Sequence, residues 1–244
     1  MTIIFYDIAS GPPVKSFAPN PCKTRYALNF KGVDYHTDWV ELPDVPSVRH
    51  RVGAALVRAH RDGSDFPTLP IIKDTVTGKV VGDSFDIAVY LDEAYPNGPS
   101  LLPPSTLPLQ HAFNISTDLV FQPYIILLTH GISFNPETAE RSKADFVWRA
   151  GVENWDQLTI RGEARAKTLD AFKVALGGLA EFYKRSDGPF MNGETPIYAD
   201  FILGGWIAFM SRTLPVNEWE DIQTWQDGFW GRFHQALQKY AELK

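Results

Sequence analysis

Two pairs of adjacent residues, Leu69-Pro70 and Asp83-Ser84, could together bind an extended peptide that carries a carboxylate. Proline is costly inside a strand unless the strand is an edge or begins there, and an apolar run follows Pro70. A cis bond before Pro70 would turn the backbone N–H and C=O of Leu69 outward, where a peptide can pair with them. The Ser84 hydroxyl and the unpaired N–H groups of a helix start suit a carboxylate. The alternative interpretation is a strand start followed by an ordinary helix cap.

The segment from Phe66 to Ala94 must position these two pairs. The residues after Pro70 and the run Lys79–Val81 each predict a strand, and Thr77-Gly78 marks the turn between them. The residues after Asp83-Ser84 have apolar positions spaced as in a helix, namely Ile87, Tyr90, Leu91 and Ala94. The segment therefore predicts a hairpin followed by a helix.

The composition excludes several kinds of partner. The chain has 244 residues, 44% of them hydrophobic, which is enough for one large domain or two smaller ones. A net charge of −6 argues against nucleic acid, because phosphate binding needs a basic surface. No apolar run reaches the roughly 18 residues that span a membrane, and the N-terminus lacks a signal-peptide pattern. Cys22 is the single cysteine, so no internal disulfide forms. We therefore expect a soluble, cytoplasmic protein with no nucleic-acid or membrane partner.

Residues 1–95 alternate between strand and helix patterns. A strand over Thr2–Tyr6, a helix over 19–32 that ends at Gly32, and a strand over Tyr35–Val40 come first. A repeat at every fourth residue from Val48 to Leu56 predicts a second helix before the hairpin. A strand–helix–strand unit implies a parallel pair with a right-handed crossover. This order resembles the thioredoxin fold, although the Cys-x-x-Cys pair of dithiol chemistry is absent.

The rest of the chain is helical in pattern. Residues 96–105 are dense in proline and glycine and predict a linker to a domain over 106–244. Helices are expected over Phe113–His130, Thr138–Asn154, Glu163–Arg185, Ala199–Arg212 and Thr224–Leu243. The helix over Ala199–Arg212 is apolar nearly all round, which predicts a buried central helix. The expected fold class is therefore an α/β thioredoxin-like N-terminal domain followed by an all-α C-terminal domain.

This organisation and four short motifs resemble the cytosolic glutathione transferases over the whole chain. Leu69-Pro70 looks like the family's cis-proline motif, which pairs with the cysteinyl part of glutathione, and Asp83-Ser84 looks like its acidic-Ser motif for the γ-glutamyl end. The segment Ala18–Leu28 looks like the helix opening that carries the catalytic residue, and Tyr198-Ala199-Asp200 resembles the cap of the central helix. The resemblance implies glutathione as co-substrate, no metal, and a homodimer.

The residue sequence of the first helix indicates a particular class within this family. Two positions in the chain depart from the family pattern. The segment from Lys23 to Gly32 is similar to bacterial lignin β-etherases and the related fungal-specific class, which implies aromatic, lignin- or wood-derived ligands. The serine and cysteine classes place their catalytic residue where this chain has Ala18, which can donate no hydrogen bond. Ile197 stands where most relatives have a helix-capping Ser, Thr or Asn. Either Thr195 replaces that cap or it is lost at a cost of about 1 kcal/mol.

Conjugation requires glutathione as a thiolate, so the site must lower the pKa of the glutathione thiol. The N-terminus of the helix that begins at residue 19 supplies partial positive charge. Three side chains could add a hydrogen-bond donor: Asn20 in the first turn, then Ser16 two residues before the usual position, then Tyr6 at the end of the first strand. Their structural alternatives are a helix cap, a solvated loop residue and core packing. Cys22 lies about one turn further on and is expected to be structural.

We expect the electrophile between the two halves, because clefts at domain interfaces are common binding sites. The loop 9–17 and the helix 113–130 should line it. The candidate aromatic contacts are Phe17, Phe113, Phe121 and Tyr124, of which about half should be core residues. Asp200 is expected to cap the central helix. A basic group is expected on a solvated helix face, with one member free to meet the glycyl carboxylate of glutathione: Arg49, His50, Arg51, Arg58, His60 and Arg61.

Three functions fit these expectations. The first is glutathione S-transferase activity on hydrophobic aromatic electrophiles. The alternative is a non-catalytic or weakly catalytic binding protein, a ligandin, that holds aromatic small molecules with glutathione as co-ligand. A turnover assay separates these two. The third is a regulatory or structural relative of this fold. The absence of an appended domain or a low-complexity tail argues against this third function.

Overall fold

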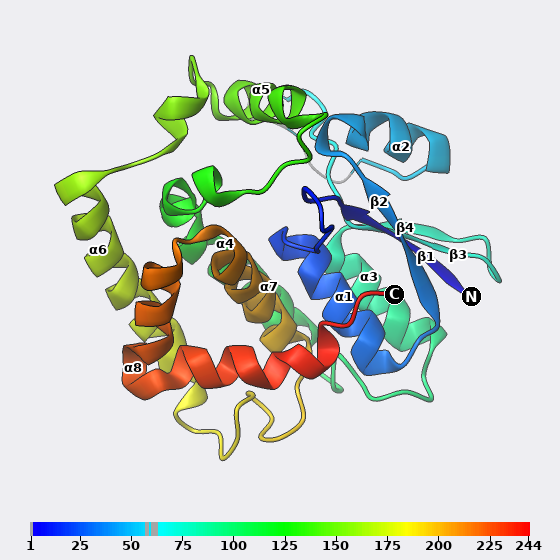
Figure 1. Ribbon diagram of the computed structural model, residues 1–244. Coiled ribbons are helices and arrows are strands. Elements are labelled where there is room, and N and C mark those ends of the chain that lie inside the picture. The colour runs from blue at the N-terminus through cyan, green and yellow to red at the C-terminus, as the bar shows by residue number, and fades with distance from the viewer. Residues whose placement is uncertain (1, 57–58, 60–62) are drawn as a thin grey trace.

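A four-stranded mixed sheet forms the centre of the N-terminal half (Figure 1). The computed structural model describes residues 2–56, 59 and 63–244. The sheet order is β2-β1-β3-β4, with β1 parallel to β2 and antiparallel to β3. The elements of this half are β1 (Ile3–Ile8), α1 (Pro19–Lys31), β2 (Tyr35–Val40), α2 (Val45–Val52), β3 (Ile71–Asp74), β4 (Val80–Gly82) and α3 (Ser84–Ala94). The thioredoxin-like fold expected from the sequence is confirmed.

The sheet separates two cores, because successive side chains of a strand point to opposite faces. Ile3 and Phe5 of β1 pack with α1 and α3 in the larger core, which continues into the helical half. Tyr6 lies on the other face in a smaller core with α2 residues and Leu69. The helices α1 and α3 therefore cover one face of the sheet and α2 covers the other.

The C-terminal half is helical and is built around one buried helix. Its elements are α4 (Leu107–Phe121), α5 (Ala139–Ala150), α6 (Gly162–Ala180), α7 (Tyr198–Thr213) and α8 (Val216–Leu237), with short 3₁₀ turns that include Gln122–Leu127 and Thr129–Gly131. Helix α7 is buried over most of its length, as expected, and packs directly on α1. The close approach requires Gly205, since a Cβ there would lie 2.4 Å from the carbonyl oxygen of Pro19.

Three expected helices differ from those in the structure. The helix expected over Phe113–His130 begins earlier and gives way to a 3₁₀ turn after Phe121, because Pro123 has no N–H to continue an α-helix. The helix expected to reach Leu56 ends at Val52, where Gly53 adopts a left-handed conformation. The last helix begins at Val216 and contains a bend at residues 225–228.

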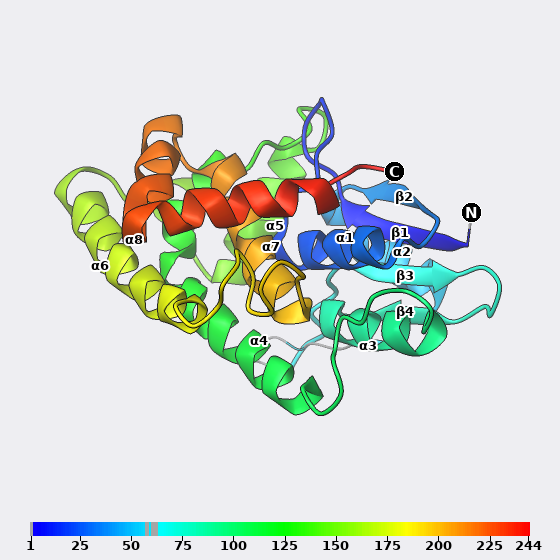
Figure 2. The ribbon, with the colours of Figure 1, turned by 90° about the horizontal axis from the view of Figure 1, so that it is seen from below.

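The C-terminal segment returns to the sheet, so both chain ends lie close to β1 and β2 (Figure 2). The backbone N–H of Thr37 donates to the carbonyl of Lys244 at 2.8 Å, and the Asn29 amide donates to the carbonyl of Tyr240 at 2.8 Å. These contacts fix the helical half against the sheet. Within the described residues, no helix is long and apolar enough to cross a membrane.

Candidate functional site

Three backbone features lie at the starts of the elements that carry the motifs found in the sequence. The peptide bond before Pro70 is cis, as the sequence suggested, and it comes directly before β3. Helix α1 begins at Pro19, and Ala18 at its N-cap makes no side-chain hydrogen bond. Its first-turn N–H groups therefore have no cap from that residue. Helix α3 begins at Ser84, and Asp83 alone separates it from the end of β4.

The start of α3 is held in an unusual backbone conformation. Asp83 has φ 81° and ψ 134°, a region that residues other than glycine rarely occupy. Its carboxylate accepts a hydrogen bond from the Phe85 N–H at 2.8 Å. Ser84 is buried, and its carbonyl accepts a hydrogen bond from the Tyr198 hydroxyl of α7 at 2.6 Å. Strain of this kind persists where surrounding contacts enforce it, and it often marks a ligand site.

An acidic cavity of about 350 Å³ opens beside Asp83, between α3 and α4. Its charged and amide lining is Asp83, Asp86, Asp118, His111, Asn114 and Gln122. Burial, and then the neighbouring Asp83, raise the pKa of Asp86. Three carboxylates in one small cavity suit a cationic group such as an amine.

Asp118 also ties the two halves together. The Lys23 ammonium of α1 is fully buried and lies 3.1 Å from the Asp118 carboxylate and 3.0 Å from the Asn114 amide oxygen. The Trp206 indole N–H of α7 donates to the same carboxylate at 2.8 Å. Helices α1, α4 and α7 thus share one partly buried polar contact. The sequence reasoning missed these residues, whose only local signal is the i, i+4 spacing of Asn114 and Asp118 on one helix face.

A second buried polar cluster lies beneath the N-terminal end of α1. Asp7 is fully buried and pairs with Arg25 at 2.8 Å. Burial opposes the charge on Arg25, but the Asp7 carboxylate outweighs it and raises the pKa of Arg25. The Ser16 hydroxyl is 3.4 Å from the Cys22 sulfur, and it offsets part of the rise in the pKa of Asp7 that burial causes. Burial raises the pKa of the Cys22 thiol, and the facing Arg212 guanidinium offsets only part of that rise.

The three candidate donors to the glutathione thiol lie in different environments. Asn20 is half-buried in the first turn of α1, beside Ala18 and Pro19. Ser16 is buried against Cys22, so the alternative of a solvated loop residue does not hold. Tyr6 packs on the α2 face of the sheet, opposite α1, which makes it a core residue away from the helix start. Cys22 is buried, as the structural interpretation expected.

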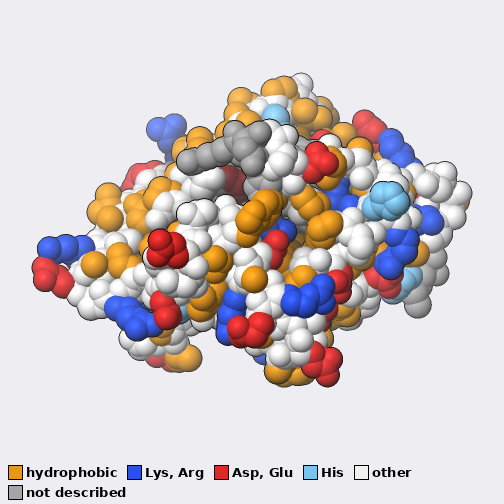
Figure 3. Space-filling view, turned by 90° about the horizontal axis from the view of Figure 1, so that it is seen from above, with side chains coloured by type: hydrophobic (Ala, Val, Ile, Leu, Met, Phe, Trp, Pro, Cys, Tyr) orange, Lys and Arg blue, Asp and Glu red, His pale blue; other side chains and the backbone are white. Residues whose placement is uncertain are grey.

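The candidate aromatic contacts mostly pack among themselves in the helical half. Phe121 is fully buried and stacks on Trp206, with ring centroids 4.8 Å apart, so it is a core residue. Tyr124 packs on Phe172, and Phe113 packs edge-on against Phe182. Phe17 is the member that borders a cavity at the junction of the halves. On the face seen in Figure 3, hydrophobic side chains gather around a hollow near the middle of the molecule.

The basic group around α2 divides into different roles. Arg49 is buried and donates to the carbonyls of Thr68 and Ala55, so the expected solvated position is wrong for this residue. It holds the segment that leads to Leu69. His50 and Arg51 are exposed, as expected. The remaining members lie outside the described residues: Arg58, His60 and Arg61.

Comparisons with known proteins agree with this arrangement. The family model for the glutathione S-transferase N-terminal domain matches residues 17–94, and that for the C-terminal domain matches residues 109–240. The chain belongs to the glutathione S-transferase family. It is 28% identical to the glutathione S-transferase-like protein ustS of Aspergillus flavus, over 96% of this chain and 89% of that protein.

Solved structures place this glutathione S-transferase among fungal relatives. A glutathione S-transferase of Ceriporiopsis subvermispora, solved in complex with glutathione, is 35% identical with a TM-score of 0.89, over 100% of this chain and 99% of that chain. A glutathione transferase of Phanerochaete chrysosporium is 29% identical with a TM-score of 0.85, over 100% and 99%. The β-etherase LigF of Sphingobium shares the fold, with 16% identity and a TM-score of 0.62 over 98% of each chain.

Proposed function

We propose that this glutathione transferase binds glutathione along Leu69 and the start of α3, and activates its thiol at the start of α1. The proposal is supported by three features: Leu69 directly before the start of β3, the uncapped helix start at Pro19 and the buried Ser84 at the start of α3. Leu69 offers backbone pairing to the cysteinyl unit. Ser84 receives the γ-glutamyl carboxylate, and the acidic cavity beside Asp83 suits the γ-glutamyl amine.

The first turn of α1 then lowers the pKa of the thiol, because its partial positive charge stabilises the thiolate. In the conjugation step the thiolate sulfur forms a bond to an electrophilic carbon of the substrate. The leaving group departs with the electrons of the broken bond, and the thiol proton goes to solvent. The proposed substrates are hydrophobic aromatic electrophiles, including wood-derived compounds, because Phe17 borders the cavity behind the helix start.

Asn20 is the proposed thiolate donor, and Asn20→Ala is expected to raise the pKa of bound glutathione by about one to two units. A hydrogen bond to a charged group is worth about 1.5–3 kcal/mol, and one pKa unit corresponds to about 1.4 kcal/mol. The measurement is a pH titration of thiolate absorbance in the glutathione complex. Asn217→Ala is the matched control, since Asn217 is also the second residue of a helix and is exposed. An unchanged thiol pKa in Asn20→Ala removes Asn20 from the mechanism.

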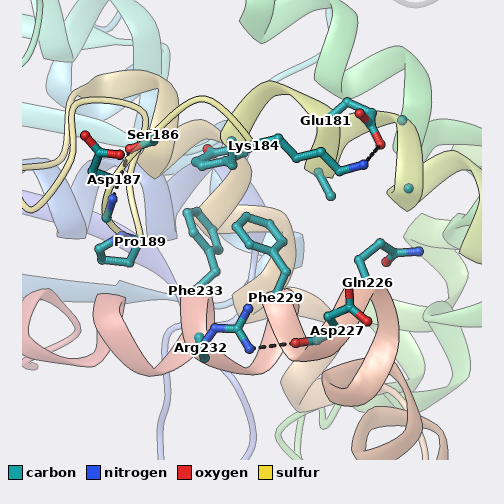
Figure 4. A pocket seen from close by; sticks show the side chains of 15 residues that line it. Glu181, Lys184, Ser186, Asp187, Pro189, Gln226, Asp227, Phe229, Arg232 and Phe233 are labelled. Carbon is teal, nitrogen blue, oxygen red and sulfur yellow. Dashed lines mark hydrogen bonds and ion pairs between the residues drawn. The ribbon is translucent and has the colours of Figure 1, made fainter.

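A second candidate function is the binding of aromatic molecules away from glutathione, favoured by a large cavity in the helical half. This cavity has a volume of about 890 Å³ and lies between the C-terminal end of α6 and α8. Phe229 and Phe233 project from α8 into it, with ring centroids 5.7 Å apart (Figure 4). Gln226 and Asp227, both with positive φ, form the bend of α8 at its edge. Small residues on α6, Gly177 and Gly178, leave space opposite the rings.

Phe229→Ala is expected to weaken binding of an anilinonaphthalene sulfonate dye about tenfold, because the half-buried ring supplies apolar contact area. Dye fluorescence in the absence of glutathione measures the affinity. Phe182→Ala is the control, since that ring is 57% exposed and lies outside the cavity lining. Displacement of the dye by glutathione, or equal effects of the two variants, would count against a separate binding site.

A further inference from the structure

A small basic cavity lies behind the loop that joins β1 to α1. It has a volume of about 300 Å³, and its lining includes Pro13, Lys15, Phe17, Ser133 and Arg212. The loop lies beside the segment that precedes α5, as Figures 1 and 2 both show, and the Gly11 N–H donates to the Ser133 carbonyl at 2.7 Å. Gly11 fits there because a Cβ would lie 2.4 Å from the Phe134 carbonyl oxygen. The walls of the cavity are therefore fixed by backbone contacts.

The charge of this region is opposite to that of the chain as a whole. The sequence contains 29 acidic and 23 basic residues, yet none of the described residues that line this cavity carries a carboxylate. A neighbouring cavity of about 470 Å³ shares Arg212 and is lined also by Arg161, Arg165 and His130, and its described lining residues include no carboxylate. The cavity beside Asp83, in contrast, is acidic. The two regions thus favour groups of opposite charge.

Arg212 stands between the two basic cavities without a charged partner. It is half-buried in the last turn of α7, and no carboxylate in the described part of the chain forms an ion pair with it. Its guanidinium donates one long hydrogen bond, 3.8 Å, to the Cys22 sulfur. Arg165 nearby is different, because Glu218 accepts two hydrogen bonds from it, each 2.6 Å long. The planar fork of Arg212 therefore keeps donors for a carboxylate.

Arg212 lies near the start of α1, where the glutathione sulfur is proposed to react. Phe17 lines the cavity and directly precedes Ala18, the N-cap of α1. Cys22, which Arg212 contacts, donates its backbone N–H to the Ala18 carbonyl at 3.0 Å. Arg212 and the start of α1 are thus separated by a single helical turn. A single aromatic ring that contacts Phe17 can reach in one direction toward Arg212 and in the other toward the helix start.

We propose that Arg212, with Lys15, receives a carboxylate carried by the aromatic electrophile, so that the enzyme selects anionic aromatic substrates. This inference rests on the proposed transferase function. Lys15 is exposed at the rim and, like Arg212, forms no ion pair with a described carboxylate. The ring of the substrate lies against Phe17, which packs on Phe209 with centroids 6.4 Å apart.

The test compares a chloronitrobenzoate with its methyl ester as substrates for glutathione conjugation. In both, the C–S bond forms as the C–Cl bond breaks, chloride leaves with the electron pair, and the thiol proton passes to solvent. Arg212→Gln is expected to raise KM for the benzoate about 10- to 100-fold and to change KM for the ester less than about twofold. Arg212→Lys should recover part of the loss. Arg185→Gln removes an exposed arginine outside both basic cavities and is the control.

The outcomes separate this inference from the proposed function. If the ester is converted but Arg212→Gln affects benzoate and ester alike, the carboxylate site is refuted while the transferase function stands. If neither compound is converted and glutathione does not bind, the proposed function fails. Calorimetry of benzoate binding without glutathione then tests Arg212 directly: affinity lost in Arg212→Gln and retained in Arg185→Gln supports the site, and equal affinity in all proteins overturns it. Thermal unfolding of each variant verifies that it is folded.

Discussion

Asp7→Ala is expected to lower the free energy of unfolding by about 3–5 kcal/mol, because it leaves the buried Arg25 without its counter-ion. Arg25 is 1% exposed and donates to Asp7 at 2.8 Å, to Thr37 at 3.1 Å and to the Tyr35 hydroxyl at 3.3 Å. The two remaining partners are neutral, so they cannot replace the carboxylate. Urea unfolding followed by circular dichroism measures the loss.

The neighbouring strand provides the control for this prediction. Asp38 lies on β2, its side chain is 48% exposed, and its one ion pair with a described residue, His36, spans 3.6 Å. Asp38→Ala should therefore cost less than about 1 kcal/mol. The double variant Asp7→Leu/Arg25→Met should recover most of the stability, since removing both charges leaves no unpaired ion. Equal losses in Asp7→Ala and Asp38→Ala would show that the buried pair does not stabilise this end of the sheet.

Much of the fold could be predicted because local signals agreed with the tertiary structure. Gly32 adopts the left-handed conformation that ends α1, and the alternation over Tyr35–Val40 corresponds to β2. The errors arose where a local break changed the helical phase. Left-handed residues at Gln226, Asp227 and Gly228 bend α8, so its first half does not share the apolar period of its second half. A prediction that assumes one continuous helical period therefore places the start of this helix too late in the sequence.

The residues of the candidate site also differ in how far the sequence could reveal them. Leu69-Pro70 and Asp83-Ser84 were recognisable because each motif is contiguous in sequence. Lys23 meets Asn114 across 91 positions, and Arg212 meets Cys22 across 190 positions. Their residue types alone do not reveal these contacts, because the packing of α7 on α1 creates them. Sequence reasoning therefore identified the contiguous motifs proposed for glutathione and missed the charged groups that only the packing of distant elements brings together.

Ser84→Ala is expected to raise the dissociation constant for glutathione about 10- to 100-fold. A hydrogen bond from a hydroxyl to a carboxylate is worth about 1.5–3 kcal/mol, and each 1.4 kcal/mol is about a tenfold change in affinity. The carbonyl of Ser84 remains bonded to the Tyr198 hydroxyl in the variant, so the start of α3 should keep its conformation. Isothermal calorimetry measures the change. Ser47→Ala is the control, because Ser47 lies in the first turn of α2 and is exposed.

A truncated ligand identifies which part of glutathione Ser84 contacts. Cysteinylglycine lacks the γ-glutamyl unit, so its weaker binding should be the same in the wild-type protein and in Ser84→Ala. Asn20→Ala should still raise the thiol pKa of bound cysteinylglycine, since the thiol is retained. If Ser84→Ala weakens cysteinylglycine as much as glutathione, then Ser84 supports the backbone of the site and the γ-glutamyl carboxylate binds elsewhere.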